Sequence, residues 1–249
     1  IKDNFIFYNA DNMDIMKFYP DNYFDLAIID PPYGIGECGD KNASRGKLAK
    51  PKSYKAFAGN DISAPDKEYF NELKRCIDLL DVNEIERIEK LIVNTIKNRG
   101  NIYIIGNGGS SSTASHYVVD FTKKLDFNEL PRVNIYNLSD NISTVTAYAN
   151  DISYEDIYFE QLKNKIVNSD MLIVLSASGK SKNLLKAAKY AKERKASVVS
   201  IVGNFEGEVL KFSDYKLIID SKDYGIIEDI HLSLNHVISS NIKEVYNHG

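Results

Sequence analysis

Short apolar runs alternate with amphipathic stretches through most of the chain after about residue 66. The apolar positions between Val82 and Asn98 recur at helical spacing, which predicts an amphipathic helix that Gly100 ends. Further helical patterns occur near Ser112–Lys124, Tyr154–Asn168, Ser181–Glu193 and Glu228–Tyr246. Apolar, β-branched runs lie between them at Ile102–Ile105, Val133–Tyr136, Met171–Leu175, Val198–Val202 and Leu217–Ile219. Continuous apolar strands that alternate with helices predict a parallel sheet with helices on both faces.

The first 66 residues have a different pattern. Two short apolar runs, Phe5–Tyr8 and Leu26–Ile29, flank a predicted helix near Asp11–Phe18. The stretch Lys41–Lys55 carries six positive charges, no acid and no hydrophobic period, which predicts a loop. We therefore expect two parts, a small α/β segment over 1–66 and an α/β domain over 67–249.

Composition narrows the class of protein. A length of 249 residues corresponds to one or two domains, and the net charge of −4 argues against a polyanion-binding protein. No apolar run is long enough to span a membrane, and no secretory signal pattern stands at the start. Two cysteines, Cys38 and Cys76, are too few for a disulfide framework, so a reducing cytoplasm is the expected location. We expect no membrane association, and nucleic acid is an improbable partner.

Two glycine- and serine-rich turns follow predicted strands. One is the run Gly106-Asn107-Gly108-Gly109-Ser110, and the other spans Ser176–Ser181. Glycine lets backbone amides approach an anion, serine hydroxyls donate to phosphate oxygens, and a following helix N-terminus favours negative charge. Simple capping of the following helix is the alternative for either turn alone. Two such turns in one sheet favour a phosphate site.

Histidines and acids gather on two predicted helices. His116 and Asp120 are four residues apart and so share a helix face. Glu228, Asp229, His231 and His236 lie on the last helix. The pattern is compatible with a divalent metal, with an acid–base pair, or with ordinary packed histidines. Glu228 and His236 are eight residues apart, a rise of about 12 Å on an ideal helix, which makes joint ligation difficult.

Residues 69–249 resemble the sugar isomerase (SIS) domain and are most similar to the phosphoheptose isomerase branch. The resemblance is carried by Gly106–Ser110, the pattern SxxxxxHxxxD from Ser110 to Asp120, AND at Ala149–Asp151, SxSGxS at Ser176–Ser181 and ExxHxxxxH from Glu228 to His236. It implies a Rossmann-like five-stranded parallel sheet flanked by helices, a homo-oligomer (tetramer or dimer), and active sites built between subunits. It also implies an aldose–ketose isomerase that interconverts sedoheptulose 7-phosphate and D-glycero-D-manno-heptose 7-phosphate through an enediol.

The same resemblance implies roles for individual residues. Asp120 would be the base and His236 the general acid. A possible zinc ion would be held by His116, Asp120, Glu228 and His236. The phosphosugar would be bound by Asn107, Gly108, Gly109, Ser110, Asn150, Asp151, Ser176, Ala177, Ser178, Ser181 and Glu228. Asp120 is one methylene shorter than the family's glutamate, and Glu228 replaces a neutral glutamine. The shorter Asp120 keeps open a module that binds a phosphosugar without turning it over.

The early part of the chain resembles another family. The tetrapeptide Asp30-Pro31-Pro32-Tyr33 follows the strand Leu26–Ile29 and is similar to the catalytic motif of amino DNA methyltransferases of the adenine-N6 type. The alternative is a rigid turn at a strand end. That resemblance implies contacts with a flipped base, and the basic run Lys41–Lys55 would meet DNA phosphates. No glycine-rich cofactor loop is found, so we expect no S-adenosylmethionine and a truncated, inactive segment. Residues Asp66–Arg75 fit either family.

Overall fold

The computed structural model describes residues 64–125 and 131–247. All of them belong to the second of the two units into which the chain divides, Asn60–Gly249. The methyltransferase-like motif Asp30-Pro31-Pro32-Tyr33, Cys38 and the basic run therefore lie outside the described residues, and the separate domain over 1–66 stays a prediction.

Five parallel strands form one sheet in the order β2-β1-β3-β4-β5. All six residues of β3 are buried, as expected for a central strand with helices on both faces. The predicted five-stranded parallel sheet is thereby confirmed. The strand bounds are Asn101–Ile105 for β1, Asn134–Asn137 for β2, Met171–Ser176 for β3, Ser197–Gly203 for β4 and Tyr215–Ile219 for β5.

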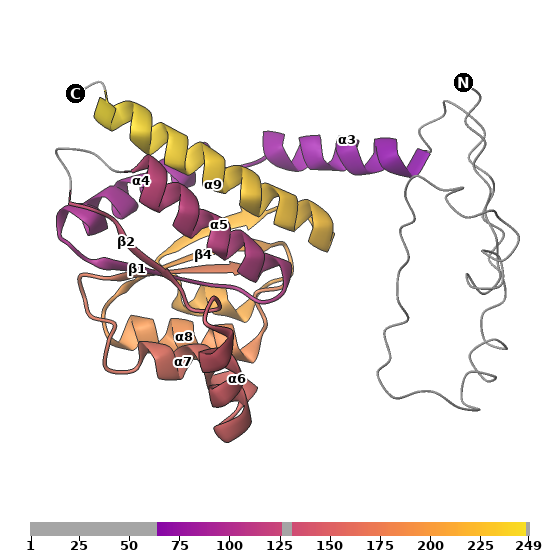
Figure 1. Ribbon diagram of the computed structural model, residues 1–249. Coiled ribbons are helices and arrows are strands. Elements are labelled where there is room, and N and C mark those ends of the chain that lie inside the picture. The colour runs from indigo at the N-terminus through magenta and orange to yellow at the C-terminus, as the bar shows by residue number, and fades with distance from the viewer. Residues whose placement is uncertain (1–63, 126–130, 248–249) are drawn as a thin grey trace, which may run out of the picture. The chain divides into compact units, whose positions relative to one another are not determined.

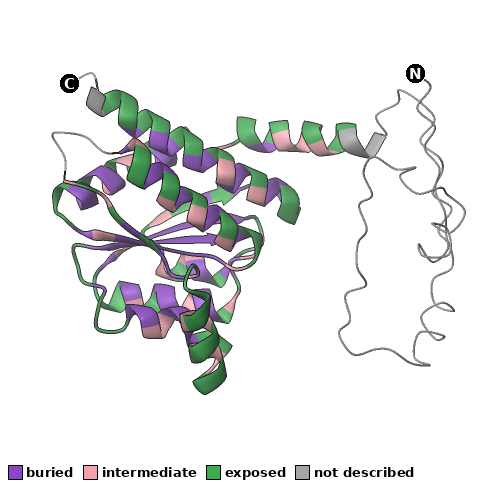
Figure 2. Ribbon diagram, in the orientation of Figure 1, coloured by how far each residue is buried: buried purple, intermediate pink, exposed green. Residues whose placement is uncertain are grey.

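Helices cover both faces of the sheet (Figure 1). On one face α4 (Val82–Lys97), α5 (Gly109–Lys124) and α9 (Tyr224–Asn247) pack over an apolar cluster that contains Ile104 and Ile173. On the other face α7 (Ile157–Leu162) and α8 (Lys182–Glu193) cover a second cluster. The buried strands and the exposed outer helix faces in Figure 2 show this layering. Among the described helices, none has the length and apolarity needed to cross a membrane.

Helix α3 (Ala64–Asp78) precedes α4, and polar contacts join it to the end of the chain. The Tyr69 hydroxyl donates to Asp229 Oδ2 of α9 at 2.7 Å. Arg75 forms an ion pair of 2.8 Å with Asp220, which follows β5. The segment Asp66–Arg75 is thus helical and contacts the α/β domain.

Several helices differ from the prediction, α7 and α6 (Ile142–Asp151) among them. The predicted helix Tyr154–Asn168 is wrong in extent, because a short 3-10 turn (Tyr154–Asp156) leads into α7, which ends at Leu162. Asn164 then has a φ of 60°, in the left-handed region that a helix cannot continue through. Helix α6 was not predicted; none of its residues is fully buried, although Val145, Tyr148 and Ala149 pack partly buried against the second cluster.

Candidate active site

The turn after β1 brings backbone very close to the start of α5. A Cβ on Gly106 would lie 2.7 Å from the carbonyl carbon of Ser110, so a side chain has no space there. Gly108 has a φ of 55°, which favours glycine. Gly108 is the N-cap of α5, and no side chain caps this helix. The first turn of α5 therefore presents its N-terminal end to the edge of the sheet.

The turn after β3 is held by its own serines. Ser176 Oγ accepts a hydrogen bond from the Gly179 amide at 2.9 Å, and Ser178 Oγ accepts one from the Lys180 amide at 3.3 Å. Gly179 has a φ of 63° and packs so closely on Gly207 that a Cβ would lie 2.9 Å from the Gly207 Cα. Ser181 is the N-cap of α8, yet its hydroxyl makes no capping bond. Side-chain capping therefore does not explain either turn.

The two turns meet at the carboxyl ends of neighbouring strands. β1 and β3 are adjacent, and the strand order reverses between them, which is where open α/β sheets bind ligands. Asn107 Nδ2 donates to Asn183 Oδ1 at 3.0 Å, and Asn183 Nδ2 donates to Asn107 Oδ1 at 2.9 Å. This reciprocal amide pair joins the first turn to the start of α8.

Two tyrosines, Tyr154 and Tyr158, also hold the turn after β1 in place. The buried Tyr158 hydroxyl donates to the Gly106 carbonyl at 2.5 Å and lies 3.2 Å from Asn107 Oδ1, and Tyr154 reaches the same Asn107 oxygen at 3.2 Å. Burial raises the pKa of Tyr158 to about 12, so its proton stays available for donation. The first turn is thereby held on two sides before any ligand arrives.

A second group of side chains lies between α5 and α9. One ligand atom from each of His116, Asp120 and His236 lies within 4.8 Å of the others. His236 Nδ1 is 2.9 Å from Asp120 Oδ2, and His116 Nε2 is 3.7 Å from the same oxygen. The two imidazole rings meet edge to face with centroids 4.9 Å apart. We call these three residues the His–Asp cluster.

Lysine 124 adds a positive charge to the His–Asp cluster. Its Nζ lies 3.0 Å from Asp120 Oδ2 and 3.2 Å from Ser239 Oγ. Burial tends to raise the pKa of Asp120, but the Lys124 ammonium and the neighbouring imidazoles outweigh it and hold that pKa below its usual range. Asp120 is therefore a carboxylate at neutral pH.

The remaining predicted site residues lie elsewhere in the chain. Glu228 is not part of the His–Asp cluster; its carboxylate packs on Gly109, where an added Cβ would lie 2.3 Å from Glu228 Oε2. Asn150 and Asp151 are exposed at the end of α6, and Asn150 donates to Asp151 at 2.9 Å. Ala177 is buried in the second turn.

His231 is a packed histidine. It is fully buried, and its Nε2 lies 3.0 Å from the Ile201 carbonyl oxygen on β4. Burial lowers its pKa to about 4, so the ring is neutral at physiological pH. His231 is thus an ordinary packed histidine, whereas His116 and His236 share a polar cluster with Asp120.

Sequence reasoning missed the polar partners of both groups. Asn183 stands two residues after the last serine of the second turn, and Lys124 stands one turn after Asp120. Asn235 donates to Asp120 Oδ2 at 2.8 Å and is fully buried. An amide within the apolar stripe of a helix, next to a candidate histidine, is the signal that could have identified Asn235.

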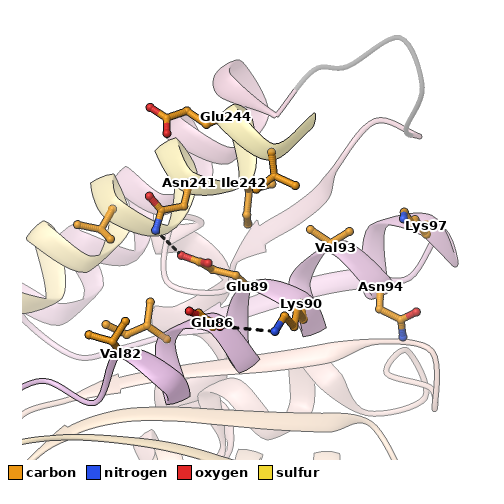
Figure 3. Close-up of a pocket in the computed structure, with 13 residues that line it drawn as sticks. Val82, Glu86, Glu89, Lys90, Val93, Asn94, Lys97, Asn241, Ile242 and Glu244 are labelled. Atoms are coloured by element: carbon orange, nitrogen blue, oxygen red, sulfur yellow. Dashed lines mark hydrogen bonds and ion pairs between the residues drawn. The ribbon is translucent and has the colours of Figure 1, made fainter. Parts of the chain in front are cut away.

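A hollow of about 720 Å³ lies between α4 and α9 (Figure 3). Its walls include Val82, Val93 and Val245, and an Asn241–Glu89 hydrogen bond of 2.9 Å crosses it. None of the predicted site residues lines this hollow. The predicted site residues therefore lie away from this hollow.

Comparison with known proteins agrees with this geometry. The SIS domain family matches residues 68–203. A phosphoheptose isomerase of Helicobacter pylori (strain ATCC 700392 / 26695) is 35% identical over 158 residues, which cover 64% of this chain and 82% of the relative. A probable phosphoheptose isomerase of Thermoplasma volcanium is 32% identical over 176 residues, or 71% of this chain and 88% of the relative.

A solved structure extends the likeness to three dimensions. The phosphoheptose isomerase GmhA from Neisseria gonorrhoeae superposes with a TM-score of 0.65 at 26% identity, covering 73% of this chain and 96% of that protein. The chain belongs to the SIS domain family and, within it, to the phosphoheptose isomerases, a family of isomerase enzymes.

Proposed function

We propose that the chain interconverts an aldose phosphate and a ketose phosphate, with sedoheptulose 7-phosphate and D-glycero-D-manno-heptose 7-phosphate as the pair. The reciprocal Asn107–Asn183 amide pair carries the proposal, because it holds two uncapped glycine- and serine-rich turns together at the point where the strand order reverses. The named relatives support the choice of substrate. We assign this function to residues 67–249.

The two turns are the proposed phosphate site. The N-terminus of α5 favours negative charge, and the hydroxyls of Ser110, Ser176 and Ser181 can donate to phosphate oxygens. Ser181 suits this role because its hydroxyl is not used to cap α8. The exposed Asn150 and Asp151 are proposed to contact the sugar hydroxyls.

The His–Asp cluster is the proposed site of proton transfer. The reaction removes a proton from the carbon next to the carbonyl, forms an enediol, and returns a proton to the neighbouring carbon. We assign the removal to Asp120, which is ionised at neutral pH. His236, 2.9 Å from Asp120 Oδ2, is assigned the proton exchange with the sugar oxygen.

The residues of the cluster fit a divalent metal. Two imidazole nitrogens and one carboxylate oxygen within 4.8 Å are donors that zinc accepts. His116, Asp120 and His236 would hold the ion, and a bound zinc would polarise the sugar carbonyl. Lys124 would have to give up its contact with Asp120 Oδ2 for the ion to bind that oxygen. Glu228 of the same chain is not placed to be a fourth ligand.

We propose that each active site combines two copies of the chain. Ser110 and Asp120 are ten residues apart on α5, a rise of about 15 Å, which exceeds the length of an extended seven-carbon phosphate ester. We therefore propose that a sugar phosphate held at the turns meets the His–Asp cluster of a second copy. A homo-oligomer, as dimer or tetramer, is part of this proposal.

Ser181→Ala tests the function. We expect about tenfold weaker binding of sedoheptulose 7-phosphate in isothermal titration, because one hydroxyl donor to a charged phosphate is lost. Ser169→Ala is the matched control, since Ser169 is exposed just before β3, at the opposite end of that strand. Unchanged binding by Ser181→Ala would contradict the phosphate site. Binding with no aldose–ketose conversion by the zinc-loaded wild-type protein would leave the non-catalytic module as the function.

A further inference from the structure

Asn235 is a buried amide with one partner. Its side chain is fully buried on α9, and its Nδ2 donates to Asp120 Oδ2 at 2.8 Å. Its Oδ1 is also buried and has no hydrogen-bond partner. The flanking Leu234 and Ile238 are buried and apolar. A leucine at 235 would avoid the cost of the unpartnered carbonyl, so the bond to Asp120 is what distinguishes asparagine at this position.

The orientation of this amide follows from its partner. If Oδ1 faced the Asp120 carboxylate, two acceptors would be opposed without a proton between them. The NH₂ group must therefore face Asp120, and Oδ1 is the atom left in the apolar interior. The Asn235 NH₂ group therefore bonds to the Asp120 carboxylate, although Oδ1 of the same amide has no hydrogen-bond partner.

Three donors share Asp120 Oδ2, and they differ in freedom. Lys124 reaches it with a long side chain that is 29% exposed, and the His236 side chain is 48% exposed. Asn235 is short and enclosed on all sides. Of these three donors, Asn235 is the one whose position the packing fixes, so its bond gives Asp120 Oδ2 a partner with a fixed place.

We propose that Asn235 is a positioning residue that orients the Asp120 carboxylate to hold a divalent cation with His116 and His236. The proposal rests on the proposed metal-assisted function of the His–Asp cluster. When a cation replaces Lys124 at the carboxylate, the Asn235 bond remains and keeps the oxygen aimed at the site. Partners of this kind commonly change metal affinity by ten- to a hundredfold.

The test measures Co²⁺ binding to the full-length protein in two ways: by titration and by the visible absorption of the bound ion. We expect Asn235→Leu to bind Co²⁺ at least about tenfold more weakly, with an altered absorption band. Its melting temperature should not fall, because the unpartnered carbonyl is removed together with the donor. Asn241→Leu is the matched control: it removes another amide-to-carboxylate bond on α9, outside the His–Asp cluster, and should leave Co²⁺ binding unchanged.

Asn235→Ala is a second variant that separates the loss of the amide from any packing effect of leucine. It should weaken Co²⁺ binding as much as Asn235→Leu does. Co²⁺ binding and spectra equal to wild type in both Asn235 variants would overturn the positioning role and leave the metal site intact. Wild-type protein that takes up no Co²⁺ would instead overturn the metal site itself, and this role for Asn235 with it. Sedoheptulose 7-phosphate should bind equally well to both Asn235 variants, because the turns are untouched.

Discussion

At the scale of single residues, Glu228 places a negative charge where the proposed phosphate would bind. Its carboxylate packs on Gly109, at the first residue of α5. The N-terminal end of a helix attracts anions, so a carboxylate there competes with a phosphate for the same field.

We therefore expect Glu228→Gln to bind sedoheptulose 7-phosphate several-fold more tightly in isothermal titration, because a like charge near the phosphate is removed. Glu244→Gln is a suitable control, since Glu244 is exposed near the other end of α9. The gain should shrink as salt screens the charge. Equal or weaker binding by Glu228→Gln would show that this carboxylate does not face the ligand.

Motif spacing placed His116 and Asp120 on one helix face, and the fold was needed to show which other side chains meet them. His116 and His236 are 120 positions apart, and only the packing of α5 against α9 brings them to one carboxylate. Glu228 lies on the same helix as His236 but two turns away, at the turn after β1. Asn235 was not predicted because a lone amide carries no motif.

At the scale of elements, α9 is joined to the sheet through His231. Its Nε2 lies 3.0 Å from the Ile201 carbonyl oxygen, and burial lowers its pKa to about 4. In the unfolded chain the His231 imidazole takes up a proton near pH 6.5, whereas in the folded chain it does so only near pH 4. Between these values the unfolded state binds more protons, so stability falls as the pH falls.

This shift corresponds to a loss of roughly 3 kcal/mol of unfolding free energy between about pH 6.5 and pH 4. Urea unfolding across that range measures it. In His231→Leu the slope of stability against pH should be shallower, whatever the absolute stability of the variant. Parallel profiles for the two proteins would refute the contribution of His231.

Elements with a long or strongly apolar pattern were predictable from sequence, and one with a short, weakly apolar pattern was not. All five strands were found because β-branched apolar runs mark buried parallel strands. Helix α6 was missed because it is short and its core-facing residues Val145, Tyr148 and Ala149 are only partly buried. The start of α9 was also misjudged: it begins at Tyr224, where Asp223 Oδ1 accepts the Ile226 amide, four residues before the apolar period was recognised.

At the scale of the whole molecule, an active site shared by two copies makes a distinctive prediction. Ser181→Asp should block the phosphate site by charge repulsion while remaining a good helix N-cap. His236→Ala should disable the His–Asp cluster. Each variant alone should be inactive.

Unfolding these two variants together and refolding the mixture should restore about a quarter of wild-type activity. With random pairing, about a quarter of the sites combine the intact turns of a His236→Ala copy with the intact cluster of a Ser181→Asp copy. An aldose–ketose assay on the refolded mixture measures the recovery. A site built within one chain would give no recovery.

The predicted architecture followed from local patterns, whereas the proposed assembly would depend on surfaces that no motif marks. Exposed apolar side chains occur on several helices of the α4–α5–α9 face, including Val82, Val119 and Val237. Scattered exposed apolar residues are also common on monomers, so the sequence pattern alone did not indicate a contact between copies.

The length of α5 has a consequence for substrate choice. One helix carries the proposed phosphate turn at its start and Asp120 about three turns further along, so in the proposed two-copy site the turns and the carboxylate that meet one sugar belong to different copies. The gap that a sugar must bridge would then be set by how the two copies dock. A small slide between the copies would retune the site toward shorter or longer carbon chains while every side chain that touches the sugar stays the same.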